Sequence, residues 1–492
     1  MQHGVRPCPP PCRRPMSLTA PALIIATAVC GGFAVLGVLY ARRQATDAEG
    51  FTAARGSTGA WWSAVSLLAL MTGTWVLFSP GEMTSYTGVA TLLGYALGMA
   101  APLLILAWLG PALVRRHPEA AGPGLMARAR WGAPAQLLIS LLAVIYMGSY
   151  LVAELTAISG VFGVIAGVPA WATAALVAGT TLTYAAWGGV RVTIFTDAVQ
   201  GWFILPLLLA AFLGTVAALG GWEAAQRPLG ERPDLMALAS RPGLEAGASL
   251  ILGIVAANLF DQSVWQRVFA CRDDATRRRA FILAAIAIIP VIMLAGWFGL
   301  WYAARNPELP AASTALFQLV AQSTPTWVAL AVLALALILV MSTLGSLANG
   351  LAGLIAADVA SFRPATTPAR RLAIGRGVTI AAALLAVPIA AAQPSVTYVF
   401  LAADLLCACA VVPVFAGLLG APLPLWGLFA AVATAMAAAI PAFPGTDFIT
   451  PMVDLRPVLH LPADCNAMLV SFGLAVGVST LVAGICVLAR RR

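Results

Sequence analysis

Charged residues are scarce in this 492-residue chain, at 10% of the total, whereas hydrophobic residues make up 61%. A soluble domain carries roughly 25% charged residues, so the composition excludes a globular protein surrounded by water. The apolar residues form long continuous runs instead of alternating with polar ones, which excludes a membrane β-barrel. Because the backbone must satisfy its own hydrogen bonds in lipid, these runs predict membrane-spanning α-helices.

Lysine is absent, so all 28 basic residues are arginines, and histidine occurs three times. The histidines fall outside the expected spans, which argues against a haem or zinc centre in the membrane. Several of the eight cysteines lie inside apolar runs, so they do not indicate a disulfide framework. The sequence has no nucleotide-binding loop, and ATP-driven transport would therefore need a partner subunit. We expect no cofactor.

Apolar runs of spanning length recur along the whole chain. A spanning helix needs about 20 residues, because the hydrocarbon layer is about 30 Å thick and a helix rises about 1.5 Å per residue. The expected fold is therefore an all-α integral membrane protein with about 13 transmembrane helices. We place the spans at residues 18–41, 60–83, 89–113, 134–160, 168–187, 196–220, 246–266, 279–303, 326–358, 373–392, 396–419, 424–442 and 466–488.

The arginines divide unevenly between the two sides of the expected membrane. Alternate loops, counted from residues 42–59 and including the tail, hold 20 arginines, and the other side holds eight. Cytoplasmic loops are enriched in arginine and lysine, so the C-terminus is predicted in the cytoplasm and the N-terminus outside a cell (inner) membrane. This distribution also explains the net charge of +9 without nucleic acid as a partner.

The N-terminal segment differs from the rest of the chain. Residues 1–17 are rich in proline, arginine and cysteine and are expected to be disordered. The first 15 residues could alternatively be an extension upstream of a start at Met16, and their presence in the mature protein stays open. Because Arg42 and Arg43 follow the first apolar run instead of preceding it, this run is a retained helix and not a secretory signal.

Four motifs lie in order along the chain. They read YAAWGGVRVTIFTDAVQ at 184–200, DQSVWQR at 261–267, MSTLGSLANG at 341–350 and VVPVFAGLLG at 411–420. Together with the expected number of spans, they resemble the signature segments of the sodium:solute symporter family. The resemblance implies the fold of the leucine-transporter group, with broken helices at the membrane midplane that hold substrate and ion.

The resemblance also implies a division of the chain. An extra first helix at 18–41 would precede a 5+5 inverted repeat. Its first half would be residues 60–220, containing spans 2–6, and its second half residues 246–420, containing spans 7–11. Residues 424–492 would supply two C-terminal helices and a basic tail.

The family pattern implies a sodium site in the ninth span. Its side-chain ligands would be the adjacent hydroxyls of Ser342 and Thr343, and backbone carbonyls would complete the shell, from Ala69, Thr72 and Leu339. Oxygen atoms suit a hard cation such as sodium. In the alternative interpretation, both hydroxyls merely bond back to the carbonyl four residues earlier or to a neighbouring helix. Some relatives carry an aspartate where this chain has Met71, which leaves coupling to sodium or to protons open.

Asp197 follows the Gly188-Gly189 pair and has two interpretations. The family pattern implies that it lies on the inner exit path of the ion. Alternatively, Asp197 with Gln200 three residues later resembles a helix capping box.

Acidic residues inside apolar runs usually face a cavity or a partner, because a charge at bilayer depth costs at least about 2.5 kcal/mol. For Glu154 and Asp261 two interpretations stay open: a role in the solute pocket or a proton relay, and a structural hydrogen-bonded acid. Glu154 shares a helical stripe with Tyr146 and Tyr150, and Asp261 falls in the span that lines the family's substrate pocket. The predicted solute pocket comprises Gly73, Trp75, Glu154, Asp261 and Gln262. Outside this set, Asp404 is expected to pair with a hydroxyl or an amide, and Glu82 to be an interfacial acid.

The function expected from these features is secondary active transport. The chain would couple a cation, sodium in the first instance, to symport of a small neutral or cationic organic solute by alternating access. No arginine falls mid-span to hold a carboxylate, which disfavours anionic solutes. The alternatives are a proton-coupled transporter of the same fold, or a membrane-embedded enzyme or channel. Expected partners are the solute, sodium ions and the lipid bilayer, and the protein would be a monomer or a weak oligomer.

Overall fold

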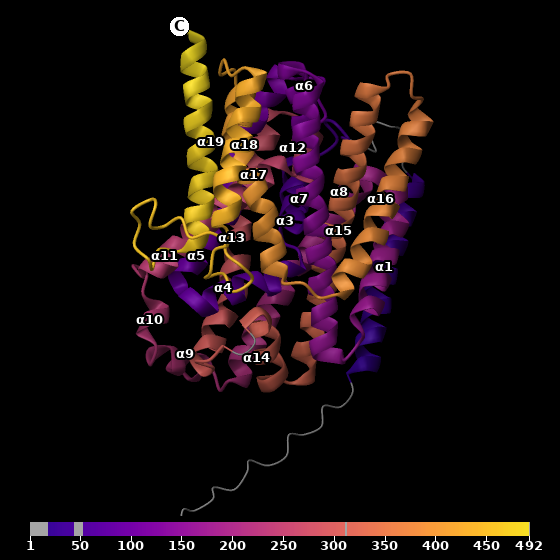
Figure 1. Ribbon diagram of the computed structural model, residues 1–492. Helices are drawn as coiled ribbons and strands as arrows, with labels where there is room; N and C mark the ends of the chain where they lie inside the picture. Colours follow the sequence, from indigo (N-terminus) through magenta and orange to yellow (C-terminus); the bar gives the residue numbers. More distant parts are fainter. Residues whose placement is uncertain (1–17, 44–52, 310–311, 492) are drawn as a thin grey trace, which may run out of the picture.

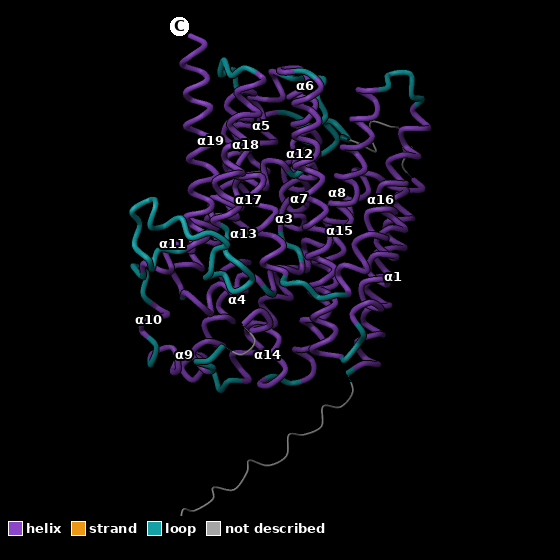
Figure 2. The backbone as a smooth tube through the Cα atoms, in the orientation of Figure 1, coloured by secondary structure: helices purple, strands orange, loops and turns teal. Residues whose placement is uncertain are grey.

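A computed structural model describes residues 18–43, 53–309 and 312–491, so the whole of the predicted disordered segment 1–17 lies outside the described residues. Within these ranges the regular structure is helical, apart from two isolated β-bridges. The long helices run side by side as a bundle (Figures 1 and 2). The prediction of an all-α membrane protein is confirmed.

The helices follow the expected spans closely. The N-terminal part contains α1 (Thr19–Arg43), α3 (Ala60–Met71), η1 (Thr74–Leu77), α4 (Ser79–Thr87), α5 (Val89–Arg116), α6 (Pro123–Trp131), α7 (Ala133–Ala166) and α8 (Ala170–Ala218). The remainder contains α9 (Trp222–Gly230), α10 (Pro233–Met236), α11 (Arg241–Phe260), α12 (Gln262–Ala270), α13 (Asp274–Arg305), η2 (Ala312–Thr314), α14 (Ala315–Ser323), α15 (Thr326–Phe362), α16 (Pro368–Ala391), α17 (Val396–Leu418), α18 (Leu425–Ala442) and α19 (Ala467–Arg491).

Eleven of the described helices are long and apolar enough to cross a membrane. The bent pair formed by α3 with η1 and α4 adds one more if it counts as a single span. A shorter apolar helix, Ala170–Leu182, corresponds to the expected fifth span. The thirteenth span therefore stays a prediction, because this helix is too short to qualify by length alone.

The second expected span is broken. Helix α3 ends at Met71, Thr72 and Gly73 leave the helical conformation, and the chain resumes with a bend of 58°. A helix that stops leaves its last carbonyls without their usual donors, so the break exposes backbone oxygens inside the protein. The seventh expected span is also broken, at Asp261 between α11 and α12.

Spans five and six are joined by a kink instead of a loop. The helix α8 runs through both, and only Gly189 departs from helical geometry, with φ of 61° and ψ of −160°. Glycine reaches a positive φ at little cost, which explains why the Gly188-Gly189 pair marks the junction. The side-chain amide of Asn349 in α15 donates to the Gly189 carbonyl at 3.2 Å and so secures the kink.

The arginine-rich elements gather at one end of the bundle. The C-terminal end of α19, the short helix α6 and the connection between α15 and α16 all lie at the end drawn uppermost in Figure 1. The helices α9, α10 and α14 lie at the opposite end. The fold thus brings together connections that the arginine count assigns to the same side of the membrane.

Candidate functional site

The break after α3 lies beside the middle of α15, where the predicted sodium ligands meet. The hydroxyl of Thr343 donates to the carbonyl of Leu70 at 3.3 Å, one residue beyond the predicted ligand Ala69. Thr343, Ser342 and Leu339 are all buried, as are Ala69 and Thr72 on the other side. The structure therefore brings the two predicted halves of the ion site together.

The hydroxyls of Ser342 and Thr343 donate to other helices and not to carbonyls of α15. Ser342 donates to the carboxylate of Asp197 at 2.9 Å, and Thr343 reaches α3 as described. The interpretation that both bond back to carbonyls four residues earlier is therefore wrong, whereas the other form of that interpretation, bonds to neighbouring helices, agrees with the structure. Their role as sodium ligands stays a prediction. By contrast, the hydroxyl of Thr72 does bond back within α3, to the carbonyl of Leu68 at 2.7 Å.

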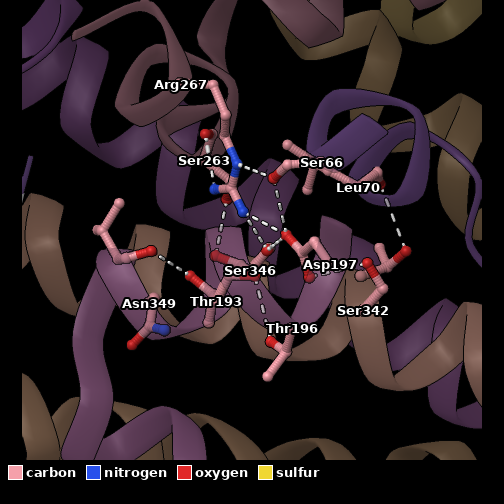
Figure 3. A network of polar contacts seen from close by, with 12 residues as sticks. Ser66, Leu70, Thr193, Thr196, Asp197, Ser263, Arg267, Ser342, Ser346 and Asn349 are labelled. Atoms are coloured by element: carbon pink, nitrogen blue, oxygen red, sulfur yellow. Dashed lines mark hydrogen bonds and ion pairs between the residues drawn. The ribbon is translucent and has the colours of Figure 1, made fainter. Parts of the chain in front are cut away.

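Asp197 is the centre of a buried polar network that joins four helices (Figure 3). One carboxylate oxygen accepts from Ser342, and the other accepts from Ser346 at 2.7 Å, from Ser66 at 3.4 Å and from Arg267 at 2.5 Å. The ion pair with Arg267 is almost completely shielded, since the two side chains are 1% and 0% exposed. The network links α8, α15, α3 and α12 next to the ion ligands.

The alternative interpretation of Asp197 as a helix cap is wrong. Asp197 lies well inside α8, so the backbone amides around it already have partners in the helix. Its carboxylate is used by side chains of other helices, and both polar atoms of the Gln200 side chain are buried without a hydrogen-bond partner among the described residues. The proposed capping box does not form.

Arg267 is a site residue that the sequence argument did not single out. It ends the DQSVWQR motif, and its guanidinium also donates to the Ser263 carbonyl at 3.0 Å and to the Ser346 hydroxyl at 2.5 Å. A buried charge without a partner is strongly unfavourable, so Arg267 and Asp197 are mutually required. The available signal was an arginine at the end of this motif, directly after the expected span 246–266.

An aromatic cavity lies between α5, α7, α11 and α17, and Trp75 of η1 also lines it. Its walls carry Trp75, Tyr95, Tyr146, Tyr150 and Phe400, with Asn258 and Asp404 as polar groups; the remaining lining residues are Ser79, Met99, Leu250, Ile254 and Leu401. The free space is about 30 Å³, enough for one or two waters. A solute therefore requires the surrounding helices to separate.

The aromatic rings hold one another in place. Trp75 donates its indole N–H to the Tyr150 hydroxyl at 2.7 Å, and its ring lies 5.8 Å from that of Tyr95. Phe400 packs edge-on against Tyr150 at 4.7 Å between ring centroids. Aromatic faces are electron-rich, so a cavity of this kind attracts cations.

Asp404 supplies the only carboxylate among the residues that line this cavity. Its side chain is 5% exposed, and within the described chain it forms neither a hydrogen bond nor an ion pair. The expectation that Asp404 pairs with a hydroxyl or an amide is therefore wrong. A buried carboxylate without a partner marks a place where a ligand can supply one.

The predicted pocket residues Trp75, Gly73 and Glu154 lie together at the break. Trp75 lines the cavity, and Glu154 accepts a hydrogen bond from the backbone N–H of Thr74 at 2.8 Å, just beyond Gly73. Glu154 thus satisfies an amide freed by the break. Gly73 leaves room for that carboxylate, because a Cβ at this position would overlap it.

Asp261 and Gln262 are placed differently from the prediction, and neither is among the residues that line the aromatic cavity. Asp261 caps α12, accepting from the backbone N–H of Ser263 at 2.7 Å. Gln262 donates to the Ala121 carbonyl at 2.6 Å and lines a separate small cavity towards α6. The α11–α12 break explains both positions, because a new helix needs a cap where it starts.

Glu82 also departs from the expectation of an interfacial acid. It is buried in α4, where it accepts from the Thr397 hydroxyl at 2.5 Å. A hydroxyl on α17 therefore replaces water as the partner of this carboxylate.

Comparison with known proteins assigns this arrangement to a family. The family model of the sodium:solute symporter family matches residues 51–421, about three quarters of the chain. The chain belongs to the sodium:solute symporter family. As a member it is a sodium-coupled solute transporter and not an enzyme, and the broken helices and the buried hydroxyls at α15 lie within the matched region.

Solved structures share the fold of this symporter. A Na⁺-coupled sialic acid symporter in a substrate-bound outward-open state superposes with a TM-score of 0.73 at 16% identity, covering 95% of this chain and 98% of that one. MhsT in complex with L-phenylalanine gives a TM-score of 0.54 at 14% identity, covering 88% and 99%. The fold class expected from the motifs is thereby confirmed.

A curated relative is similar in sequence. The symporter is 26% identical over 361 residues to the spermidine transporter DUR31 of Candida albicans (strain SC5314 / ATCC MYA-2876). The aligned region covers 72% of this chain and 67% of the relative.

Proposed function

We propose that this symporter couples sodium entry to the uptake of a small cationic organic solute, of the amine class, bound in the aromatic cavity. The observation that carries the proposal is the unpartnered carboxylate of Asp404 among the rings of Trp75, Tyr95, Tyr150 and Phe400. Neutral solutes, which the sequence left equally open, do not account for this carboxylate. The spermidine transporter of Candida albicans supports the same class.

The physical argument rests on compensation of charge. A carboxylate inside the bilayer region costs at least about 2.5 kcal/mol on insertion scales, and an ammonium group bound against it offsets that cost. Aromatic faces add about 0.5–2 kcal/mol for each well-placed cation contact. A neutral solute would leave Asp404 without a counter-charge. The charge of a solute should therefore affect its binding in the cavity more than its shape does.

Sodium supplies the driving force in this proposal. The cation would bind the hydroxyls of Ser342 and Thr343 together with carbonyls of Ala69, Thr72 and Leu339, and would leave past Asp197. Moving one charge inward across 100 mV yields about 2.3 kcal/mol. At about 1.4 kcal/mol per tenfold ratio, this supports roughly fortyfold accumulation of a neutral solute. A cationic solute gains further, because its own charge also moves down the potential.

The test is uptake by the purified protein in proteoliposomes with an imposed sodium gradient. Labelled spermidine, choline, glucose and proline serve as the panel, and we expect uptake of the amines alone. Asp404→Asn should raise the half-saturating amine concentration by about tenfold or more, equivalent to about 1.4 kcal/mol. Glu82→Gln is the matched control, because that buried carboxylate is bonded to Thr397 and does not line the cavity.

Two results would contradict the proposal. Sodium-driven uptake of glucose or proline that amines do not inhibit would overturn the solute class. Amine uptake driven equally well by a proton gradient without sodium would overturn the coupling ion, and would direct attention to Glu154, whose second carboxylate oxygen is buried without a hydrogen-bond partner among the described residues.

A further inference from the structure

A basic groove lies apart from the solute cavity and the ion site. It is formed where the end of α1 and the start of α3 meet the kinked part of α8, and its volume is about 580 Å³. Two arginines from distant parts of the chain line it, Arg191 on α8 and Arg272 between α12 and α13. The hydroxyls of Ser57 and Thr58 border the same space.

Neither arginine has a carboxylate within ion-pair distance among the described residues, although Asp273 attracts Arg272 at longer range. Arg191 and Arg272 form no ion pair within the part of the chain that the structure describes, and the Nε of Arg191 is buried without a hydrogen-bond partner there. The acid that follows Arg272, Asp273, instead caps α13 by accepting from the Thr276 amide at 2.7 Å. Among the described residues, the groove is therefore lined by two positive charges and an unused buried donor, which indicates an anionic ligand.

The aromatic residues of the groove place it at the level of the lipid headgroups. Tyr40 stacks on Phe195 with ring centroids 4.0 Å apart, and Trp62 lies 6.2 Å from Phe195. Trp62 is about half exposed on the surface of a membrane protein, and Tyr40 lies near the end of the first apolar helix, just before Arg42 and Arg43. Tyrosine and tryptophan concentrate at this interface, where one end of the ring is apolar and the other polar.

We propose that the groove binds the phosphate headgroup of an anionic membrane lipid. Guanidinium groups bind phosphate through paired hydrogen bonds, and two of them facing one groove can hold both sides of a phosphodiester. The exposed ring of Trp62 offers an apolar surface for the first part of an acyl chain. Basic pockets between spanning helices are a general means of binding such headgroups.

The bound lipid would link two elements of the ion site. Arg191 lies on the same helix as Asp197, six residues earlier, and Arg272 follows the helix that carries Arg267. The backbone already connects this region, since the Thr58 amide donates to the Ala270 carbonyl at 2.9 Å. A phosphate shared by both arginines would therefore hold α8 against the end of α12.

The test compares lipid binding by the full-length protein in detergent. Native mass spectrometry and thermal unfolding are measured with phosphatidylglycerol, with phosphatidylcholine and with inorganic phosphate. We expect phosphatidylglycerol to remain bound and to raise the unfolding temperature, and Arg191→Gln with Arg272→Gln to weaken its binding about tenfold or more. The matched control is Arg363→Gln with Arg370→Gln, two exposed arginines of the α15–α16 region outside the groove.

Three results would overturn the proposal: equal binding of phosphatidylglycerol by the groove variant and the control, equal stabilisation by phosphatidylcholine, or full protection by inorganic phosphate at the same concentration. If the double glutamine variant fails to fold, Arg191→Lys with Arg272→Lys replaces it. Lysine keeps the charge but loses the paired hydrogen bonds, so binding weakened severalfold supports the site and unchanged binding refutes it.

Discussion

Ser342 would have a double role in the proposed ion site. Its hydroxyl hydrogen points to Asp197 at 2.9 Å, so the lone pairs of the oxygen are directed away from the carboxylate and are available to a cation. The carboxylate also polarises the hydroxyl, which increases the negative charge on that oxygen. Arg267 balances Asp197, and the network around the proposed site therefore carries no net charge of its own.

Removing both hydroxyls should weaken sodium binding selectively. We expect Ser342→Ala with Thr343→Ala to raise the sodium concentration for half-maximal uptake by about an order of magnitude, because two of five oxygen ligands are lost. Uptake in proteoliposomes at varied sodium concentration measures the effect.

The matched control is Thr193→Ala with Thr196→Ala. These hydroxyls lie close to the same network but bond back to carbonyls of α8 (Figure 3). An unchanged sodium dependence in the Ser342 and Thr343 variant, or an equal shift in the control, would exclude the proposed ligands.

At the scale of helices, the two breaks differ in whether they leave backbone polar groups available to other helices. The break after α3 frees carbonyls towards α15 and an amide towards Glu154, so it presents polar backbone on both sides. The break between α11 and α12 is closed by its own side chain, since Asp261 caps the second helix. The proposed ion site and the aromatic cavity consequently share the first break, and the second break places Arg267 on the short helix α12.

Substitutions of Asp261 should therefore change the stability of the protein more than its affinity for the solute. Asp261→Ala should lower the free energy of unfolding by about 0.5–2 kcal/mol, the usual cost of losing an N-cap, whereas asparagine, itself a good cap, should have little effect. Thermal unfolding of the purified variants measures this difference. A changed amine affinity in Asp261→Asn, with unfolding unaffected, would instead restore Asp261 to the solute pocket.

At the scale of the whole molecule, the arginine-rich end defines the orientation in the membrane. The elements at that end in Figure 1 include the connection between α15 and α16 and the end of α19, which together hold several exposed arginines. We expect this end to be cytoplasmic, because arginine-rich loops are retained on that side. A C-terminal reporter that is active only in the cytoplasm should therefore be active, and activity of a periplasmic reporter at the same position would reverse the topology.

The sequence alone indicated that the protein is embedded in a lipid bilayer, that its spans are helical and which family it resembles. Lipid forces every spanning segment to be apolar and helical over about 20 residues, so this information is local and can be read from composition and run length. The motifs added Ser342, Thr343 and Asp197 as predictions, because each occupies a recognisable place in a short motif.

Only the tertiary structure decided which polar groups meet. Asp197 and Arg267 are 70 positions apart, and Ser342 is 145 positions from Asp197, so no local pattern contains their pairing. The same holds for Asp404, whose exposure to an aromatic cavity depends on how α17 packs against α7 and α11. A buried acid inside an apolar run has the same sequence signature whether it caps a helix, as Asp261 does, or faces a ligand, because the difference lies in the neighbours that packing brings to it.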